Sequence, residues 1–175
     1  MITVISGTNR ANSNSIIIAQ LYQQLLTELG TPSTLLDLSL LPDAFTAASS
    51  LYNFQDRHEQ FEELNRLVAN GHKFVVIVPE YNGSFPGVLK AFIDGLEYPA
   101  SFKNKKIGLV GISDGSMGGV LAMSHLTDVF NYLGAEVLSF KPRLQGIKKC
   151  LQEGKLKDEK ANRLLREHAE RFIGF

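Results

Sequence analysis

The feature that most constrains the fold is an uninterrupted apolar segment at residues 74–78, followed directly by a loop rich in glycine and proline. A short strand that is apolar at every position is typical of a parallel sheet covered by helices on both faces. Pro79 ends the strand because it has no N–H to donate, and Asn82-Gly83 and Pro86-Gly87 are turn dipeptides. We therefore predict a central strand whose carboxyl end opens into a loop, which is where open α/β sheets bind ligands. A connection from strand to helix without a ligand is the alternative.

Strand-like and helix-like segments alternate along the rest of the chain. Further strands are expected at residues 2–6, 34–38, 107–112 and from residue 136, and amphipathic helices are expected near residues 18–29, 61–68, 88–96, 116–133 and 158–172. Five such units joined by right-handed crossovers predict an α/β fold with a five-stranded parallel sheet of order 2-1-3-4-5 and helices on both faces. The 175 residues suit one domain, 1–175.

A second polar loop follows the first predicted strand. It contains Thr8, Arg10, Ser13, Asn14 and Ser15, which offer hydroxyl and amide groups and one permanent cation. A phosphate group here would meet a helix N-terminus and Arg10 together. The same residues would also suit a simple capping loop with Ser13 or Asn14 as the N-cap. No Walker A motif and no Gly-x-Gly-x-x-Gly follows the strand, which argues against nucleoside triphosphates and a Rossmann dinucleotide site.

The two loops together resemble the NADPH-dependent FMN reductase family of flavodoxin-like proteins. That family carries Gly-Ser-x-Arg-x-x-Ser-x-Asn after its first strand and Pro-Glu-Tyr-Asn-x-Ser-x-Pro-Gly-x-Leu-Lys after its third. Gly7, Arg10 and Ser13 match the first motif, and the second is matched by Pro79, Glu80, Tyr81, Asn82, Ser84, Pro86, Gly87, Leu89 and Lys90. Thr8 and Ser15 depart from the first motif but keep hydroxyls that can donate to phosphate. The resemblance extends over the whole chain and implies a flavodoxin-like three-layer sandwich.

The resemblance also implies a cofactor and a reaction. The expected enzyme passes hydride from NADPH or NADH through FMN to a small acceptor, which could be a flavin, a quinone, an azo compound or a metal oxyanion. The FMN phosphate is expected on the first loop, and the flavin ring on the second loop and on a third loop that leaves the fourth strand. The candidate cofactor-binding residues are Thr8, Arg10, Ser13, Asn14, Ser15, Pro79, Glu80, Tyr81, Asn82, Gly83, Ser113, Asp114 and Gly115. Glu80 could instead cap the following helix or pair with Lys90. Because the cofactor carries the hydride chemistry, no catalytic side chain is predicted.

Two other functions remain open. The first is a flavodoxin-type electron carrier that binds FMN but has no nicotinamide site. The second is a serine hydrolase, because residues 111–115 fit the Gly-x-Ser-x-Gly nucleophile elbow with Ser113 as nucleophile and His125 or His168 as a possible base. The hydrolase hypothesis leaves both upstream motifs without a role. His58, His72 and His168 are otherwise predicted to lie at the surface.

Composition limits the partners. Lys plus Arg and Asp plus Glu both number 18, so the formal net charge is +0 and no global field favours nucleic acid or an anionic membrane. The single cysteine, Cys150, cannot form an internal disulfide and is predicted to be a structural or surface thiol. No metal-ligand spacing is present. The chain has no signal-peptide pattern and no apolar run near the ~18 residues that span a bilayer, so a cytoplasmic protein is expected.

An oligomer is expected from the resemblance, since sites in the family commonly lie at a dimer interface, sometimes within a tetramer. The apolar loop at residues 45–54, with Phe85, Tyr98 and Phe102, is predicted to form the contact because it would otherwise leave an exposed apolar patch. The basic turn at residues 103–106 is predicted to be solvated.

Overall fold

The apolar segment of the sequence forms β3 (Lys73–Pro79), which lies in the middle of a parallel sheet. The computed structural model describes residues 1–42, 45, 59–98 and 101–175. Its sheet has the order β2-β1-β3-β4-β5, which confirms the predicted order and the flavodoxin-like fold class. The other strands are β1 (Ile2–Ser6), β2 (Ser33–Asp37), β4 (Lys106–Ile112), β5 (Glu136–Val137) and β6 (Arg143–Leu144).

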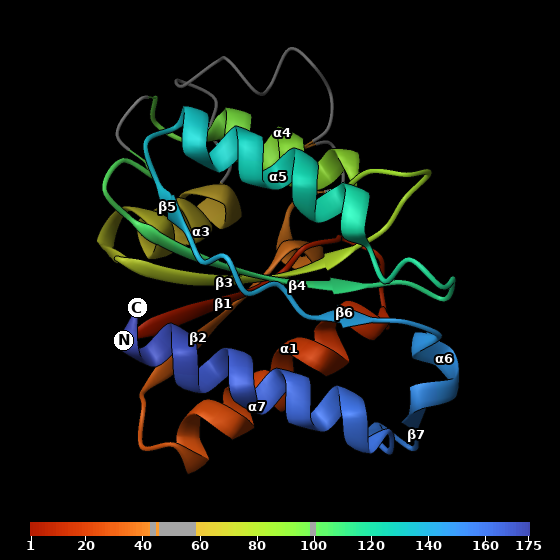
Figure 1. Cartoon of the computed structure of the whole chain (residues 1–175). Coiled ribbons are helices and arrows are strands. Elements are labelled where there is room, and N and C mark those ends of the chain that lie inside the picture. Colours follow the sequence, from red (N-terminus) through yellow and green to blue (C-terminus); the bar gives the residue numbers. More distant parts are fainter. Residues whose placement is uncertain (43–44, 46–58, 99–100) are drawn as a thin grey trace.

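Helices cover both faces of the sheet (Figure 1). One face carries α3 (Glu59–Asn70), α4 (Gly87–Gly95) and α5 (Val120–Tyr132), and the other carries α1 (Asn14–Glu28) and α7 (Glu159–Gly174). Short elements complete the described chain: η1 (Leu38–Leu40), α6 (Ile147–Cys150) and the hairpin β7 (Leu151–Gln152) and β8 (Lys155–Leu156). Each face has its own hydrophobic core, and β3 contributes to both because its side chains alternate between the faces.

The fifth strand differs from the prediction. Instead of one continuous strand beginning at Glu136, two short segments pair with β4: β5 with its start and β6 with its end. Pro142 lies just before β6 and has no N–H for a ladder, although its carbonyl accepts a hydrogen bond from Gly111. The interruption brings β6, and α6 after it, to the carboxyl edge of the sheet (Figure 1).

The prediction of a surface position was wrong for His168. The residue is 0% exposed, its Nδ1 lies 2.7 Å from the Tyr22 hydroxyl, and its ring stacks on Phe172. Gly108 of β4 makes room for it, because a Cβ there would lie 2.8 Å from His168 Cε1. His72 is exposed as predicted, and His58 lies outside the described residues.

Two further residues predicted at the surface are buried. Lys105, in the basic turn, donates from Nζ to the carbonyls of Val68 and Ala69 at the C-terminal end of α3. Phe102, predicted in a dimer contact, packs edge-on against Phe74 and Phe130 in the core. Both predictions failed because a long stem or a ring can be buried from a turn when the neighbouring layer accepts it.

The remaining residues of the predicted dimer contact differ in burial. Phe45 is buried and stacks on Phe61, Phe85 packs partly on the core, and Tyr98 is exposed as predicted. The other aromatic and apolar residues of that loop, Leu51, Tyr52 and Phe54, lie outside the described residues. In the parts of the chain that the structure describes, no helix combines the length and the apolar character needed to cross a membrane.

Candidate functional site

Three loops meet at the carboxyl edge of the sheet, because β1, β3 and β4 are parallel neighbours and each ends there. They enclose a half-open cavity of about 310 Å³. The predicted residues that line it are Thr8, Arg10, Ser13, Asn14, Ser15, Pro79, Glu80, Tyr81, Ser113 and Asp114. Asn82, Gly83 and Gly115 are not among the lining residues. The structure therefore brings together side chains from all three loops that the sequence singled out.

The first loop is held tightly against β3. Gly7 donates from its N–H to the carbonyl of Ile77 at 3.0 Å, and a Cβ on Gly7 would lie 2.6 Å from that same oxygen. Thr8 is buried, and its Oγ1 lies 3.0 Å from the Tyr81 hydroxyl of the second loop. The Arg10 N–H also donates to Thr8 Oγ1. Glycine is required by the close approach of two backbones, and the hydroxyl pair joins the first two loops.

The N-terminus of α1 lies at this cavity, which Ser13, Asn14 and Ser15 line. Ser13 is the N-cap, as one of the sequence-based alternatives proposed, and its Oγ accepts from the Ile16 N–H at 3.3 Å. The first turn of α1 contains no acidic residue, so its positive end is not neutralised from within the helix. Ser15 Oγ is buried without a hydrogen-bond partner among the described residues. Buried hydroxyls are usually paired, so this one is available to a ligand.

The second loop is a tight hairpin-like turn. Tyr81 and Ser84 exchange backbone hydrogen bonds of 2.7 and 3.1 Å, and Asn82 and Gly83 between them both have positive φ, 51° and 80°. Two positive values at the central positions are those of a type I′ turn, which Asn-Gly favours. The Glu80 N–H donates to the Ile112 carbonyl at 3.1 Å, which fixes this loop to β4.

Glu80 lines the cavity and has neither of the roles that the alternative hypothesis offered. Lys90 pairs with Asp94 at 2.6 Å within α4, and α4 starts at Pro86 without a side-chain cap.

The third loop is shaped by Ser113. Its Oγ donates to the Gly115 carbonyl and accepts from the Gly118 N–H, both at 3.0 Å. Neither histidine proposed as a base reaches this hydroxyl: His125 Nδ1 lies 2.9 Å from Ser84 Oγ, and His168 is buried on the opposite face with Tyr22. The serine of the nucleophile-elbow motif therefore shapes a turn here, and neither of the two predicted bases contacts it.

Four lining residues were missing from the sequence-based site: Asn12, Ile112, Ile147 and Lys148. Lys148 lies 3.0 Å from the Asp114 carboxylate, and this charged hydrogen bond lowers the pKa of Asp114. Ile147 and Lys148 belong to α6, which reaches the site because Ser113 pairs with Leu144 and Ile147 through the backbone. No local pattern in the sequence indicates that contact. Asn12 lies inside the first motif and could have been included from its position alone.

A parallel sheet of order 2-1-3-4-5, with its ligand-sized cavity at the carboxyl ends of β1 and β3, defines a flavodoxin-like protein with a site at the topological switch point. The chain belongs to the NADPH-dependent FMN reductase family, whose model matches residues 1–140. As a class, this is a family of FMN-using reductases that take electrons from a nicotinamide donor.

Known proteins with similar sequences or structures include flavin enzymes and a quinone reductase. FerB, a flavoenzyme NAD(P)H:(acceptor) oxidoreductase from Paracoccus denitrificans, has a TM-score of 0.82 and 25% identity, covering 99% of this chain and 94% of its own. A 2-hydroxy-1,4-benzoquinone reductase of a Burkholderia species is 35% identical over 86 residues, which is 45% of this chain and 47% of the relative. The match thus spans about half the length of that curated relative. EmoB, an NADH:FMN oxidoreductase, is 22% identical and has a TM-score of 0.73, covering 98% of this chain and 87% of its own. At that identity the likeness shows the fold alone.

Proposed function

We propose that this chain is an FMN-dependent NAD(P)H oxidoreductase that reduces a small aromatic acceptor of the quinone type. The observation that carries the proposal is the single cavity shared by the three loops after β1, β3 and β4. A cavity of about 310 Å³ is at the lower end of the range for small-molecule sites, and its open side allows a ligand to extend beyond it.

The polar end of the cavity has the donors that a phosphate monoester requires. Arg10, the Thr8, Ser13 and Ser15 hydroxyls and the first-turn N–H groups of α1 would hold the FMN phosphate. The strongest sign of fit is Ser15, a residue that lines this cavity and whose buried Oγ has no partner in the described structure. Asn14 would add a side-chain amide at the same end.

The cavity also has apolar lining residues. Pro79, Ile112 and Ile147 provide apolar surface, and Tyr81 provides a ring at the mouth. We propose that these residues would hold the flavin ring, with the backbone N–H groups of Asn82 and Gly83 and the loop at Ser113, Asp114 and Gly115 as candidate hydrogen-bond donors to it. Bound FMN would supply hydride transfer between the nicotinamide and the acceptor, which no side chain can perform.

The protein's own contribution is a fixed shape. The Tyr81–Ser84 turn, the Tyr81–Thr8 hydroxyl contact and the two hydrogen bonds of Ser113 keep the three loops in one arrangement. Such preorganisation avoids the cost of ordering the loops when cofactor and substrates bind. No acid, base or nucleophile needs to be assigned.

Support for a quinone acceptor comes from the Burkholderia relative, which is a 2-hydroxy-1,4-benzoquinone reductase. FerB, an NAD(P)H:(acceptor) oxidoreductase, supports a reductase of this kind but not a particular acceptor. NADPH is proposed as the donor because the matching family is described by it. Free flavins, azo compounds and metal oxyanions are the other acceptors to be compared.

The proposal is tested by following the flavin band near ~450 nm, which reports the redox state of the cofactor directly. The purified protein is mixed with FMN, and NADPH or NADH is added without oxygen. Binding of FMN followed by rapid bleaching is expected, and 1,4-benzoquinone should then restore the band.

Binding without bleaching by either nucleotide would indicate an electron carrier instead. Absence of FMN binding would refute the proposal. In that case, turnover of p-nitrophenyl esters that disappears in Ser113→Ala would favour the hydrolase.

A further inference from the structure

A polar hollow of about 350 Å³ lies between α5 and the segment that leads from β5 into β6, and it is called the α5–β6 hollow below. None of the predicted cofactor-binding residues lines it. Five of its lining residues carry a hydroxyl group or a positive charge: Ser124, Thr127, Ser139, Lys141 and Arg143. Hydroxyls and cations are the side-chain groups that bind phosphate oxygens, so the hollow has the composition of an anion site.

The two cations of the α5–β6 hollow are unused within the described residues. The side chains of Lys141 and Arg143 take part in none of the ion pairs or hydrogen bonds found there, whereas Lys148 of the first cavity pairs with Asp114. Lys141 is half-buried, and burial lowers its pKa below the ordinary value because the charged form loses hydration. An anion bound beside it would stabilise the charged form again.

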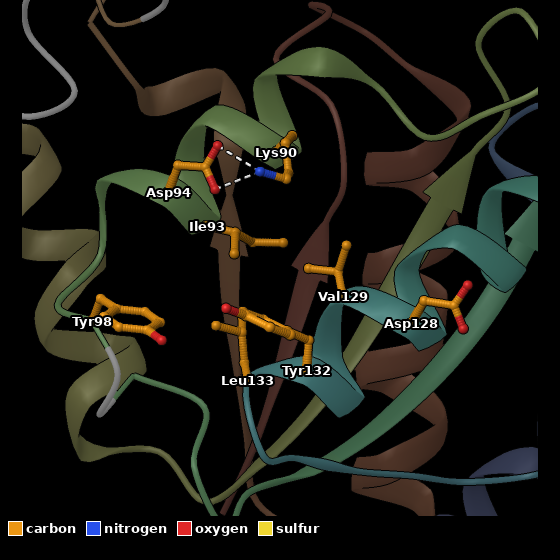
Figure 2. Close-up of a pocket in the computed structure, with 8 residues that line it drawn as sticks. All are labelled: Lys90, Ile93, Asp94, Tyr98, Asp128, Val129, Tyr132 and Leu133. Carbon is orange, nitrogen blue, oxygen red and sulfur yellow. Dashed lines mark hydrogen bonds and ion pairs between the residues drawn. The ribbon is translucent and has the colours of Figure 1, made fainter.

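Asp128 is the one acidic residue among the described residues that line the hollow. It forms no ion pair with Lys141 or Arg143 or with any other described residue. Asp128 also lines a neighbouring hollow between α4 and α5, and Figure 2 shows its carboxylate pointing away from the Lys90–Asp94 pair there. Two cations and one carboxylate leave the α5–β6 hollow with a net positive charge, which favours a ligand that carries more than one negative charge.

The third loop of the functional site separates this hollow from the first cavity. Ser113 lines the first cavity, and its Oγ accepts a hydrogen bond from the Gly118 N–H at 3.0 Å. Gly118 packs on Arg143, because a Cβ at Gly118 would lie 2.7 Å from Arg143 Cβ. A long ligand that crosses this loop would therefore contact both sites. NADPH has such a form, with the nicotinamide at one end and the adenosine 2′-phosphate at the other.

We propose that the α5–β6 hollow binds the adenosine 2′-phosphate of NADPH through Lys141 and Arg143, while the nicotinamide lies in the first cavity. This inference rests on the proposed function and adds the residues that would distinguish NADPH from NADH. A phosphate monoester carries a charge of about −1.5 to −2 at pH 7, and NADH lacks this group. Arg143 offers a planar fork to its oxygens and Lys141 a point charge. The Ser124 and Ser139 hydroxyls have no hydrogen-bond partner among the described residues and would donate to the same group.

Isothermal titration calorimetry of the full chain, in excess FMN, tests the site with adenosine 2′,5′-bisphosphate and with 5′-AMP, which lacks the 2′-phosphate. The bisphosphate should bind at least about tenfold more tightly, as a charge-assisted hydrogen bond implies. Arg143→Gln should reduce this preference to within about threefold, and Asp128→Asn should increase it because a repelling charge is lost. The matched control is Arg163→Gln, which removes an exposed arginine of α7 on the opposite face of the sheet and should leave the preference unchanged.

Steady-state kinetics give a second comparison. Arg143→Gln should lower the ratio of kcat/KM for NADPH to kcat/KM for NADH by about tenfold. The value for NADH should stay the same, because NADH has no 2′-phosphate to lose. A general loss with both nucleotides would contradict a role in recognising the 2′-phosphate.

Equal affinities for the bisphosphate and 5′-AMP would overturn the proposal, as would a preference that Arg143→Gln and Lys141→Gln both leave intact. Binding of inorganic phosphate without a preference for the bisphosphate would indicate a free-phosphate site and would overturn it too. The preference should persist in Arg10→Ala, since its loss there would place the bisphosphate in the first cavity. If the preference depends on Arg143 but neither NADPH nor NADH bleaches the flavin, the phosphate site is supported and the proposed function is refuted.

Discussion

Replacing His168 by glutamine is expected to make the free energy of unfolding less dependent on pH. The imidazole is 0% exposed between α7 and the sheet, with Tyr22 on Nδ1 and Phe172 stacked on the ring. Burial lowers the pKa of His168 from its ordinary value of 6.5 to about 3. The folded protein therefore keeps this ring neutral under conditions in which the unfolded chain protonates it.

The size of the effect follows from proton linkage. Between pH 6.5 and about pH 3 the unfolded state binds more protons than the folded state at this residue, so acidification favours unfolding. The contribution is complete above pH 6.5 and is lost as the pH falls. With these pKa values, His168 accounts for a loss of about 2 kcal/mol between pH 7 and pH 5, and about 4 kcal/mol by pH 3.

Urea unfolding of the wild type and of His168→Gln at pH 7 and pH 5 measures the difference. The wild type should lose about 2 kcal/mol more than the variant, because all other titrating groups cancel in the comparison. The exposed His72→Gln is the control and should behave like the wild type. Equal losses in the wild type and in His168→Gln would refute the reasoning.

If His168→Gln does not fold, a measurement on the wild type alone can test whether burial keeps the His168 ring neutral. The NMR signal of the His168 ring should not titrate between pH 5 and pH 8, and a titration near pH 6.5 would show that the ring is not held neutral by burial.

Three further substitutions test the site and its frame. Arg10→Ala should raise the FMN dissociation constant about tenfold to a hundredfold, which corresponds to the ~1.5 to 3 kcal/mol of a charge-assisted hydrogen bond. The control is Arg163→Ala, which changes an exposed arginine and should leave the dissociation constant unchanged. Equal affinities of the two variants in a fluorescence titration would show that Arg10 does not bind FMN. Lys105→Met should lower the free energy of unfolding, measured in urea, by about 1 to 3 kcal/mol because the Val68 and Ala69 carbonyls lose their donor. Lys103→Met, at an exposed lysine of the same turn, should lower it by less than about 0.5 kcal/mol. Similar losses in the two variants would contradict the argument that Lys105 is buried. Gly7→Ala should destabilise the protein by about 1 to 3 kcal/mol because its Cβ would lie 2.6 Å from the Ile77 carbonyl oxygen. Gly87→Ala is the control, since its Cβ would meet nothing within 4 Å. If the two variants were equally stable, the first loop would have to shift to accommodate the added methyl group.

Much of the fold could be predicted from the sequence because the patterns that indicate strands, turns and helix caps are local. The apolar segment at residues 74–78 forms β3, whose side chains are buried on both faces, as the pattern indicated. Asn82-Gly83 adopts the positive φ values that its turn requires, and Ser13 caps α1. The order of the strands followed from short right-handed connections, which leave few ways to arrange such units.

The sequence predicted only those site residues that lie on the loops directly after the strands. Residues after β1, β3 and β4 converge because parallel strands place their carboxyl ends at one edge, and sequence order alone implies this. Ile147 and Lys148 were missed because they reach the cavity through pairing of β6 with β4, a contact between segments that share no local pattern.

The sequence by itself determined the layers, the strand order and the three loops, because hydrophobic period, turn residues and helix caps act within a few residues of one another. Tertiary structure alone decided the burial of His168 and Lys105 and the division of the fifth strand. The reason is that burial depends on which face of which neighbour covers a residue. That choice is made between segments far apart in the chain, where the residue type alone carries no information.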